Sequence, residues 1–223
     1  MSVPAPRAAL PAVQVVPMRR WHLHQVLDIE QRVYPRPWSA TLFGSEMAAR
    51  DTRRYVVALA PRQQPTRRPG RRVMGYAGVL IQAQEAHVTT VAVDPDHHRQ
   101  KVATALLITL LEEARRLGAS AATLEVRVAN RGAQRLYQGF GFAPVGVRPG
   151  YYAETGEDAL IMWVHDIDQP DYEQVLHAQR ERRSLPGGAS GAPDHPVPWV
   201  QGRTGLRVRP AGSAELHRQG GGR

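Results

Sequence analysis

Hydrophobic and polar residues follow two different periods in the middle of this chain. Residues 88–93 are mostly β-branched, which favours a strand, and a polar loop begins at Asp94-Pro95. Within residues 101–117, apolar side chains recur at spacings of three and four, which places them in one stripe along a helix. We therefore expect a strand, a short polar loop and the start of a helix at the centre of the fold.

The same two periods predict the elements on either side. Strands are expected over residues 13–16, 55–60, 73–81, 85–93, 122–128, 143–147 and 159–164. Helices are expected over residues 19–33, 39–50, 101–117 and 130–140. Pro35 and Pro37 end the first helix, and the Ser39 side chain can cap the second. There is no internal repeat in this order, so the middle of the chain is predicted to be one domain.

Composition divides the chain into four parts. Residues 1–11 contain three prolines and are expected to be a disordered lead, and residues 12–166 carry the predicted domain. Residues 167–185 form a polar extension in which residues 172–183 have a helical pattern. Residues 186–223 are rich in glycine and proline and show little periodicity. Such a segment cannot bury enough apolar surface to fold, so a disordered tail is expected.

The residue content excludes several kinds of chemistry. The chain has no cysteine, which excludes disulfides, thiolate metal sites and a cysteine acyl-enzyme. His97 and His98 are neighbours in a loop without a third ligand at a suitable spacing, so no metal site is expected. No apolar run reaches the length of a membrane span, and the start of the chain lacks a signal-peptide core. A cytoplasmic protein with no membrane contact is therefore expected.

The positive charge is a second compositional feature. The formal net charge is +9, almost all of the bases are arginines, and Lys101 is the only lysine. Such an excess can attract polyanions at long range. A nucleic-acid-binding module would also need aromatic side chains among the bases, and the basic loop 61–72 has none. We therefore expect no specific nucleic-acid partner.

The start of the helix near Lys101 is a candidate anion site. The first amide groups of a helix have no partner inside it, and the helix dipole places about half a positive charge there. The backbone amides of residues 99–104 could therefore bind a phosphate group. Because an ordinary strand–loop–helix unit has the same pattern, this feature alone does not specify a function.

Longer motifs give a more specific indication. The stretch VAVDPDHHRQKVATALL (91–107) resembles the acetyl-CoA motif of the GNAT acetyltransferases, and LEVRVANRGAQRLYQGFGF (124–142) resembles the second signature of that family. The pieces IEQ (29–31) and PWS (37–39), together with Tyr-Tyr at 151–152 ahead of EDALIM, resemble the RimI type within the family. The resemblance covers roughly residues 13–164.

This resemblance implies a fold, a reaction and a co-substrate. The implied fold class is α/β (α+β), with a mixed, mostly antiparallel central sheet flanked by helices. RimI-type enzymes move an acetyl group from acetyl-CoA to the α-amino group of the N-terminal alanine of a small-subunit ribosomal protein. The amine attacks directly, with no acyl-enzyme. The implied partner is therefore the N-terminal segment of such a ribosomal protein.

The resemblance also assigns residues to acetyl-CoA. The pyrophosphate would be held by the backbone of Arg99, Gln100, Lys101, Val102, Ala103 and Thr104. The pantetheine would run along Val91, Ala92 and Val93, and Asn130 would contact CoA in addition to capping its helix. Lys101 departs from the family pattern, which has glycine at this position. If the position requires a positive φ, lysine costs about 1 kcal/mol there, and its ammonium could recover part of this beside a phosphate.

The remaining assignments concern catalysis and the acceptor. Glu125 is the candidate proton acceptor, because it alternates with Leu124 and Val126 and so faces away from their side of the strand. Tyr137 is the candidate proton donor for the departing thiolate. The resemblance places four residues along the peptide groove: Glu30, Trp38, Tyr151 and Tyr152.

Alternatives remain for these residues and for the function. Glu125 could be a structural carboxylate paired with Arg127, and the aromatic residues could be core side chains. The chain could also acetylate a small-molecule amine such as a polyamine or an antibiotic. A third alternative is a binding module that has kept the CoA site and lost turnover, which the lysine at 101 favours slightly.

Overall fold

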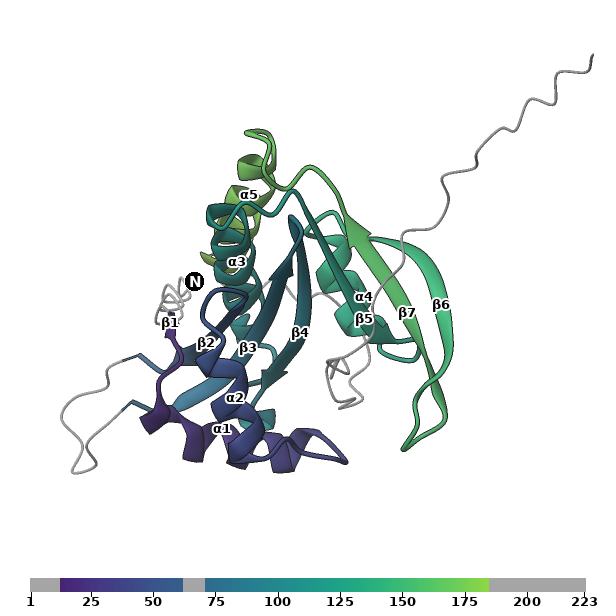
Figure 1. The fold of residues 1–223 in the computed structure, drawn as a ribbon. Helices are drawn as coiled ribbons and strands as arrows, with labels where there is room; N and C mark the ends of the chain where they lie inside the picture. The colour runs from purple at the N-terminus through teal and green to yellow at the C-terminus, as the bar shows by residue number, and fades with distance from the viewer. Residues whose placement is uncertain (1–12, 62–70, 185–223) are drawn as a thin grey trace, which may run out of the picture.

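A computed structural model describes residues 13–61 and 71–184, and Figure 1 shows their fold. The expected disordered lead and tail, and most of the basic loop 61–72, lie outside the described residues. The described part contains seven strands in one sheet, β1 (Gln14–Pro17), β2 (Arg53–Leu59), β3 (Val73–Gln82), β4 (Glu85–Val93), β5 (Ala121–Arg127), β6 (Ala143–Tyr152) and β7 (Glu157–Val164).

Five α-helices and two short 3-10 helices accompany the sheet. The α-helices are α1 (Leu23–Val33), α2 (Ala40–Ala48), α3 (Val102–Arg116), α4 (Arg131–Gln138) and α5 (Tyr172–Ser184). The 3-10 helices are η1 (Arg20–His22) and η2 (Pro95–His97). The Ser39 hydroxyl accepts a hydrogen bond from the Leu42 amide at 3.2 Å, so Ser39 caps α2 as predicted.

The strand order in the sheet is β1-β2-β3-β4-β5-β7-β6. All neighbouring strands are antiparallel except β4 and β5, which are parallel. A parallel pair requires a crossover connection, and α3 supplies it. The mixed, mostly antiparallel sheet expected from the sequence is therefore confirmed.

Two hydrophobic layers cover the two faces of the sheet. On one face α3, α4 and α5 pack over the strands, and four leucines of α3 (106, 107, 110 and 111) are completely or almost completely buried. Burial of each such side chain typically stabilises a fold by about 1.5–3 kcal/mol. On the other face α1 and α2 cover β2, β3 and β4 around Phe43 and Tyr76. Figure 1 shows this arrangement, with α1 and α2 on the opposite side of the strands from α3.

Three expectations from the sequence need correction. The first predicted helix is interrupted at His22, where η1 gives way to α1. The strand expected to end at Val147 continues to Tyr152, because Gly150 adopts a positive φ of 58° and a register irregularity between Arg148 and Tyr152 carries the chain past Pro149. The predicted helix of the extension exists as α5, but Ile167 and Leu176 are completely buried in the main core, so the boundary drawn at residue 166 falls inside the packed domain.

Candidate active site

The parallel strands β4 and β5 separate after a short contact. Glu85, Ala86 and His87 pair with residues 121–123, and no pairing follows between the remainders of the two strands. Figure 1 shows the two strands running apart from this point. Side chains satisfy part of the β4 edge instead, because the Tyr34 hydroxyl donates to the Val91 carbonyl at 3.3 Å. Val91, Ala92 and Val93, which were predicted to guide the pantetheine, lie along this separated edge.

The polar loop after β4 is anchored at both of its aspartates. The buried Asp94 carboxylate forms salt bridges with Arg32 at 2.6 Å and with Arg72 at 2.9 Å. The same two arginines also form salt bridges with Asp96. Hydrogen bonds from Arg32 and then from Arg72 hold the pKa of Asp96 below its usual value. These contacts fix the direction in which the chain enters α3.

The backbone before α3 adopts the left-handed conformation at two residues. The φ angles are 63° at Arg99 and 58° at Lys101, so the positive φ considered for the lysine position is present. The first hydrogen bond of α3 runs from the Ala105 amide to the Lys101 carbonyl at 3.1 Å. The amides of Val102, Ala103 and Thr104 therefore have no acceptor within the helix, and the residues of the predicted cradle, with Gln100, come together at one anion-binding helix end. The Val102 side chain is buried, so only its backbone can contribute.

Lys101 does not stand free at this helix end. Its ammonium donates hydrogen bonds to the backbone carbonyls of Arg182 and, at 3.4 Å, Arg183 in the last turn of α5. The sequence suggested that the ammonium could approach a phosphate, whereas the structure directs it to another helix.

Glu125 lies on the face of β5 opposite the α3 core, as its alternation with Leu124 and Val126 predicted. The residue is only 3% exposed. Its Oε1 lies 3.2 Å from an Arg148 nitrogen and its Oε2 lies 3.2 Å from His87 Nε2. Oε2 has no aligned hydrogen-bond donor among the described residues. This buried oxygen therefore keeps an unused capacity to accept a hydrogen bond.

The sequence reasoning missed both neighbours of Glu125. His87 alternates with Ala86 and Val88 on β4, so the strand period could have placed it on the same face as Glu125. Arg148 was missed because its strand was expected to end at Val147. Arg127, the ion-pair partner considered for Glu125, instead pairs with Glu154 at 2.9 Å and with Glu157 in the β6–β7 turn.

The electrostatic state of His87 follows from its surroundings. Burial lowers the pKa of His87, the Glu125 carboxylate raises it in part, and Arg148 lowers it further. The net pKa lies below the ordinary value, so the imidazole is mainly neutral at pH 7. Its side chain is 23% exposed. A neutral imidazole between a buried carboxylate and solvent can relay a proton.

Tyr137 is buried in α4 and its hydroxyl has no hydrogen-bond partner among the described residues. Burial raises the pKa of this phenol well above its ordinary value, so the oxygen retains its proton at neutral pH. A buried hydroxyl without a partner is rare in native structures. The group therefore fits a donor whose acceptor arrives with the substrate.

The tyrosines around the separated strands come from both hydrophobic layers of the sheet. Tyr137 belongs to the α3–α4 side, whereas Tyr34 belongs to the α1–α2 side. Burial raises the pKa values of Tyr34 and Tyr152, Tyr137 adds to both shifts, and Glu125 adds to that of Tyr152. The candidate acid Tyr137 and the candidate base Glu125 therefore both belong to the surroundings of Tyr152.

The four predicted acceptor residues have different surroundings. Glu30 is fully buried, and its carboxylate accepts from the Trp38 amide at 2.8 Å and from the Tyr76 hydroxyl. Trp38 is half-buried, and its ring packs 5.4 Å from that of Phe43. In this arrangement Glu30 fixes the segment between α1 and α2 and presents no surface to a peptide.

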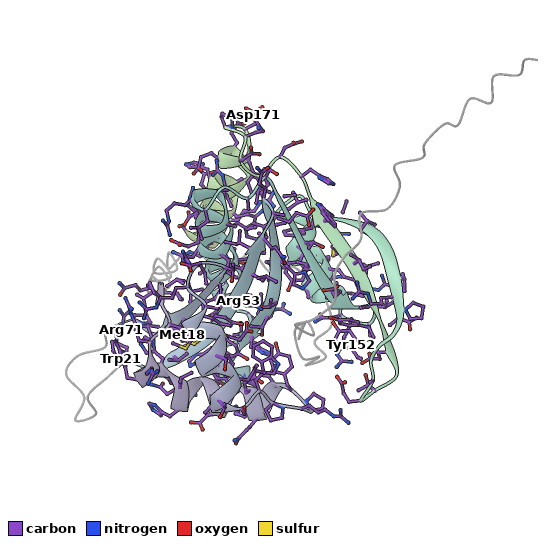
Figure 2. All side chains as sticks on the ribbon, in the orientation of Figure 1. Met18, Trp21, Arg53, Arg71, Tyr152 and Asp171 are labelled. Carbon is purple, nitrogen blue, oxygen red and sulfur yellow. The ribbon has the colours of Figure 1, made fainter. Side chains whose placement is uncertain are left out.

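The two tyrosines at the end of β6 are packed under arginines. The Arg127 guanidinium lies 3.9 Å from the Tyr152 ring centre, and Arg148 lies 5.1 Å from that of Tyr151. Tyr152 is buried and its hydroxyl has no partner in the part of the chain that the structure describes, whereas Tyr151 is half-buried. Figure 2 shows Tyr152 on the β6–β7 side of the molecule, away from Met18 and Trp21.

Asn130 caps α4, as its chemistry predicted. Its Oδ1 accepts from the Ala133 amide at 3.0 Å, and the residue is 8% exposed. Two negative findings apply to the described part of the chain. Residues 13–61 and 71–184 contain no group of three or more histidine, aspartate or glutamate side chains that could hold a metal ion. No helix within these ranges is long and apolar enough to cross a membrane.

Three features of this region fit acyl transfer. They are the separated parallel pair β4–β5 in a mixed sheet, the start of α3 after a left-handed loop, and the buried Glu125 carboxylate and Tyr137 hydroxyl. A profile of the Acetyltransferase (GNAT) family matches residues 23–142, and the chain belongs to this family. It is therefore an N-acetyltransferase that takes its acetyl group from acetyl-CoA.

The relatives specify the type more closely. The ribosomal protein bS18-alanine N-acetyltransferase of Escherichia coli K12 is 35% identical over 136 residues, which is 60% of this chain and 84% of the relative. The N-alpha-acetyltransferase RimI of Mycobacterium tuberculosis is 35% identical over 61% of this chain and 80% of its own. The crystal structure of the E. coli S18-alanine enzyme superposes with a TM-score of 0.59 at 29% identity, covering 70% of this chain and 94% of that one.

Proposed function

We propose that the protein acetylates the α-amino group of the N-terminal alanine of ribosomal protein bS18. The observation that carries this proposal is the likeness to enzymes named for that reaction, at 35% identity over most of their length. The site supports it with a base, an acid and an anion-binding helix end around one opening. We place the reaction in the cytoplasm, and it requires only the first residues of the acceptor and no nucleic acid.

The proton of the amine is proposed to leave through Glu125. An α-ammonium has a pKa near 8, so roughly a tenth of it is already neutral at pH 7, and a carboxylate acting through water suffices as acceptor. Oε2 of Glu125 takes the proton, and His87 passes it to solvent. A lysine ammonium, with a pKa near 10.4, would demand a stronger base.

Acetyl-CoA supplies the acetyl group as a thioester. The Tyr137 hydroxyl holds a proton for the departing sulfur, because burial keeps the phenol neutral. The first amides of α3 bind negative charge, and the backbone of residues 91–93 orients the chain of the co-substrate along β4. Three features of residues 13–61 and 71–184 support this fit: a phenol without a partner there, helical amides without an acceptor inside α3, and a strand edge that β5 leaves unpaired.

Mass spectrometry of the products tests the acceptor. The full-length protein is incubated with acetyl-CoA and a peptide with the N-terminal sequence of bS18, beside the same peptide with a blocked α-amine and a set of polyamines. A gain of about 42 Da on the first amine, absent from the blocked peptide, supports the proposal. The variant Glu125→Gln should lose most of this activity, whereas Glu85→Gln, the same exchange at an exposed end of β4, should keep it.

Other outcomes distinguish the alternatives. Acetylation of polyamines only would assign the enzyme a small-molecule acceptor. CoA binding without any transfer would identify a binding module that has lost turnover.

A further inference from the structure

Helix α5 lies beyond the residues matched by the family profile, yet it packs beside α3. Its Leu176 side chain is completely buried, and the Tyr172 hydroxyl donates to the Phe140 carbonyl at 2.7 Å. Gln179 donates to the Gly139 carbonyl, directly after the helix that carries Tyr137. Arg180 pairs with Glu112 of α3. The extension is therefore fastened to both helices that form the co-substrate side of the site.

The C-terminal end of α5 lies against the loop that begins α3. The last carbonyls of a helix have no partner inside it and carry the negative end of the helix dipole. Lys101 places its ammonium on two of these carbonyls, those of Arg182 and Arg183. One residue therefore connects the negative end of α5 to the positive end of α3.

The left-handed backbone of Lys101 gives the contact with α5 a structural role. Its φ of 58° is a conformation that a lysine adopts only at a free-energy cost and a glycine adopts readily. The family pattern has glycine at this position. The contact with α5 offsets the cost of the left-handed backbone and holds the loop in the form that leaves the next three amides open.

We infer that Lys101 is a positioning residue that couples α5 to the acetyl-CoA loop, and that its ammonium acts on the α5 carbonyls rather than on a phosphate. This inference rests on the proposed use of the loop for acetyl-CoA. It makes α5 part of the working enzyme, because the shape of the co-substrate site depends on a helix outside the family core.

Binding of CoA to the full-length protein, measured by calorimetry, tests the coupling. Lys101→Met keeps the aliphatic stem and the backbone cost but removes the ammonium, so the dissociation constant should rise about three- to fivefold. Lys101→Gly removes both the ammonium and the free-energy cost of the left-handed backbone, so it should recover part of the lost CoA affinity. Arg182→Gln is the matched control. Lys101 contacts the backbone carbonyl of Arg182, which this exchange keeps, so the variant should bind CoA like the unmodified protein. In the transfer assay, Lys101→Met should raise KM for acetyl-CoA and leave kcat within about twofold.

Chemical labelling distinguishes the coupling from a direct phosphate contact. Because Lys101 is the only lysine, an amine-reactive acylating reagent followed by peptide mapping reports its ammonium separately from the α-amine of Met1. Slow labelling with and without CoA supports the inference. Rapid labelling that CoA suppresses would overturn the inference and indicate a direct phosphate contact. Unchanged CoA binding by Lys101→Met would also overturn it. Both readouts remain valid if the acceptor proves not to be bS18.

Discussion

Glu30 and Glu125 are both buried glutamates, and both were assigned to the site from the sequence, Glu30 through the family resemblance and Glu125 through its position on the strand. Glu30 is 0% exposed and Glu125 is 3% exposed, so burial does not distinguish them. Their partners do. Glu30 accepts hydrogen bonds from the Trp38 amide and the Tyr76 hydroxyl, both within the α1–α2 layer. Glu125 faces His87 on β4 and Arg148 on β6, two half-buried groups.

We expect this difference to separate a structural carboxylate from a catalytic one. Donors hold both oxygens of Glu30, so a proton transfer there would disrupt the contact between α1 and β3. Within the described ranges one oxygen of Glu125 has no aligned donor, and His87 lies between it and solvent. A buried acid can exchange protons only when it keeps such a route, so the surroundings of each carboxylate predict which one affects turnover and which one affects stability.

The largest expected effect is on turnover, at Glu125. Glu125→Gln keeps the size of the side chain but removes its ability to accept a proton. We expect kcat/KM for the acceptor peptide to fall about 10²–10³-fold, in the range typical of general bases. The melting temperature should change little, because the partners Arg148 and His87 retain contact with solvent. Retention of more than a tenth of the activity would remove Glu125 from the role of base.

The second effect is on stability, at Glu30. Glu30→Gln introduces a buried NH2 group without an acceptor and weakens the bonds to Trp38 and Tyr76. We expect the free energy of unfolding to fall by about 2 kcal/mol, measured by urea denaturation. Glu113→Gln is the control, since that carboxylate is 31% exposed and its ion pairs should contribute at most about 0.5 kcal/mol. If Glu30→Gln reduced kcat at full stability, the two carboxylates would not differ in the proposed way.

The sequence contained part of this distinction. The two-residue period of β5 placed Glu125 off the core face, and this was confirmed. Helical spacing could have done the same for Glu30, because it follows Val26 by four residues and lies in the buried stripe of α1 with Ile29. Its hydrogen-bond partner Tyr76 is 46 residues away, and only the packed fold brings them together.

Long-range contacts account for the other features that the sequence did not reveal. Arg148 reaches Glu125 only because β6 continues past a proline and a glycine, where local rules end a strand. The Lys101 contact with α5 spans 81 residues, so the motif could indicate the strained backbone but not the group that offsets it. The elements themselves were predicted to within a few residues, because hydrophobic periodicity is a local signal.

A third prediction concerns the positioning of the base by Arg148. Arg148→Gln removes the group 3.2 Å from Glu125 Oε1 and leaves the carboxylate free to rotate. We expect kcat for the acceptor peptide to fall about five- to tenfold, because misorientation costs less than loss of the base. Steady-state kinetics check this, with Arg116→Gln as control, since Arg116 lies on the surface of α3 and pairs only with Glu113 among the described residues. An equal loss in both variants would argue against a local role for Arg148.

The smallest expected effect is the pH dependence of stability at His87. Burial lowers the pKa of His87 in the folded protein below its ordinary value near 6.5, so protonation favours the unfolded chain. The stability that neutral His87 contributes is therefore present above about pH 6.5 and decreases as the pH falls below it.

Urea denaturation at intervals between pH 7 and 5.5 should show this decline in the unmodified protein and a shallower one in His87→Gln. His22, whose pKa burial also lowers, remains in both proteins, so the difference between the two slopes isolates His87. A steeper decline in His87→Gln would mean that the attraction of Glu125 outweighs burial and that the imidazole next to the base is charged.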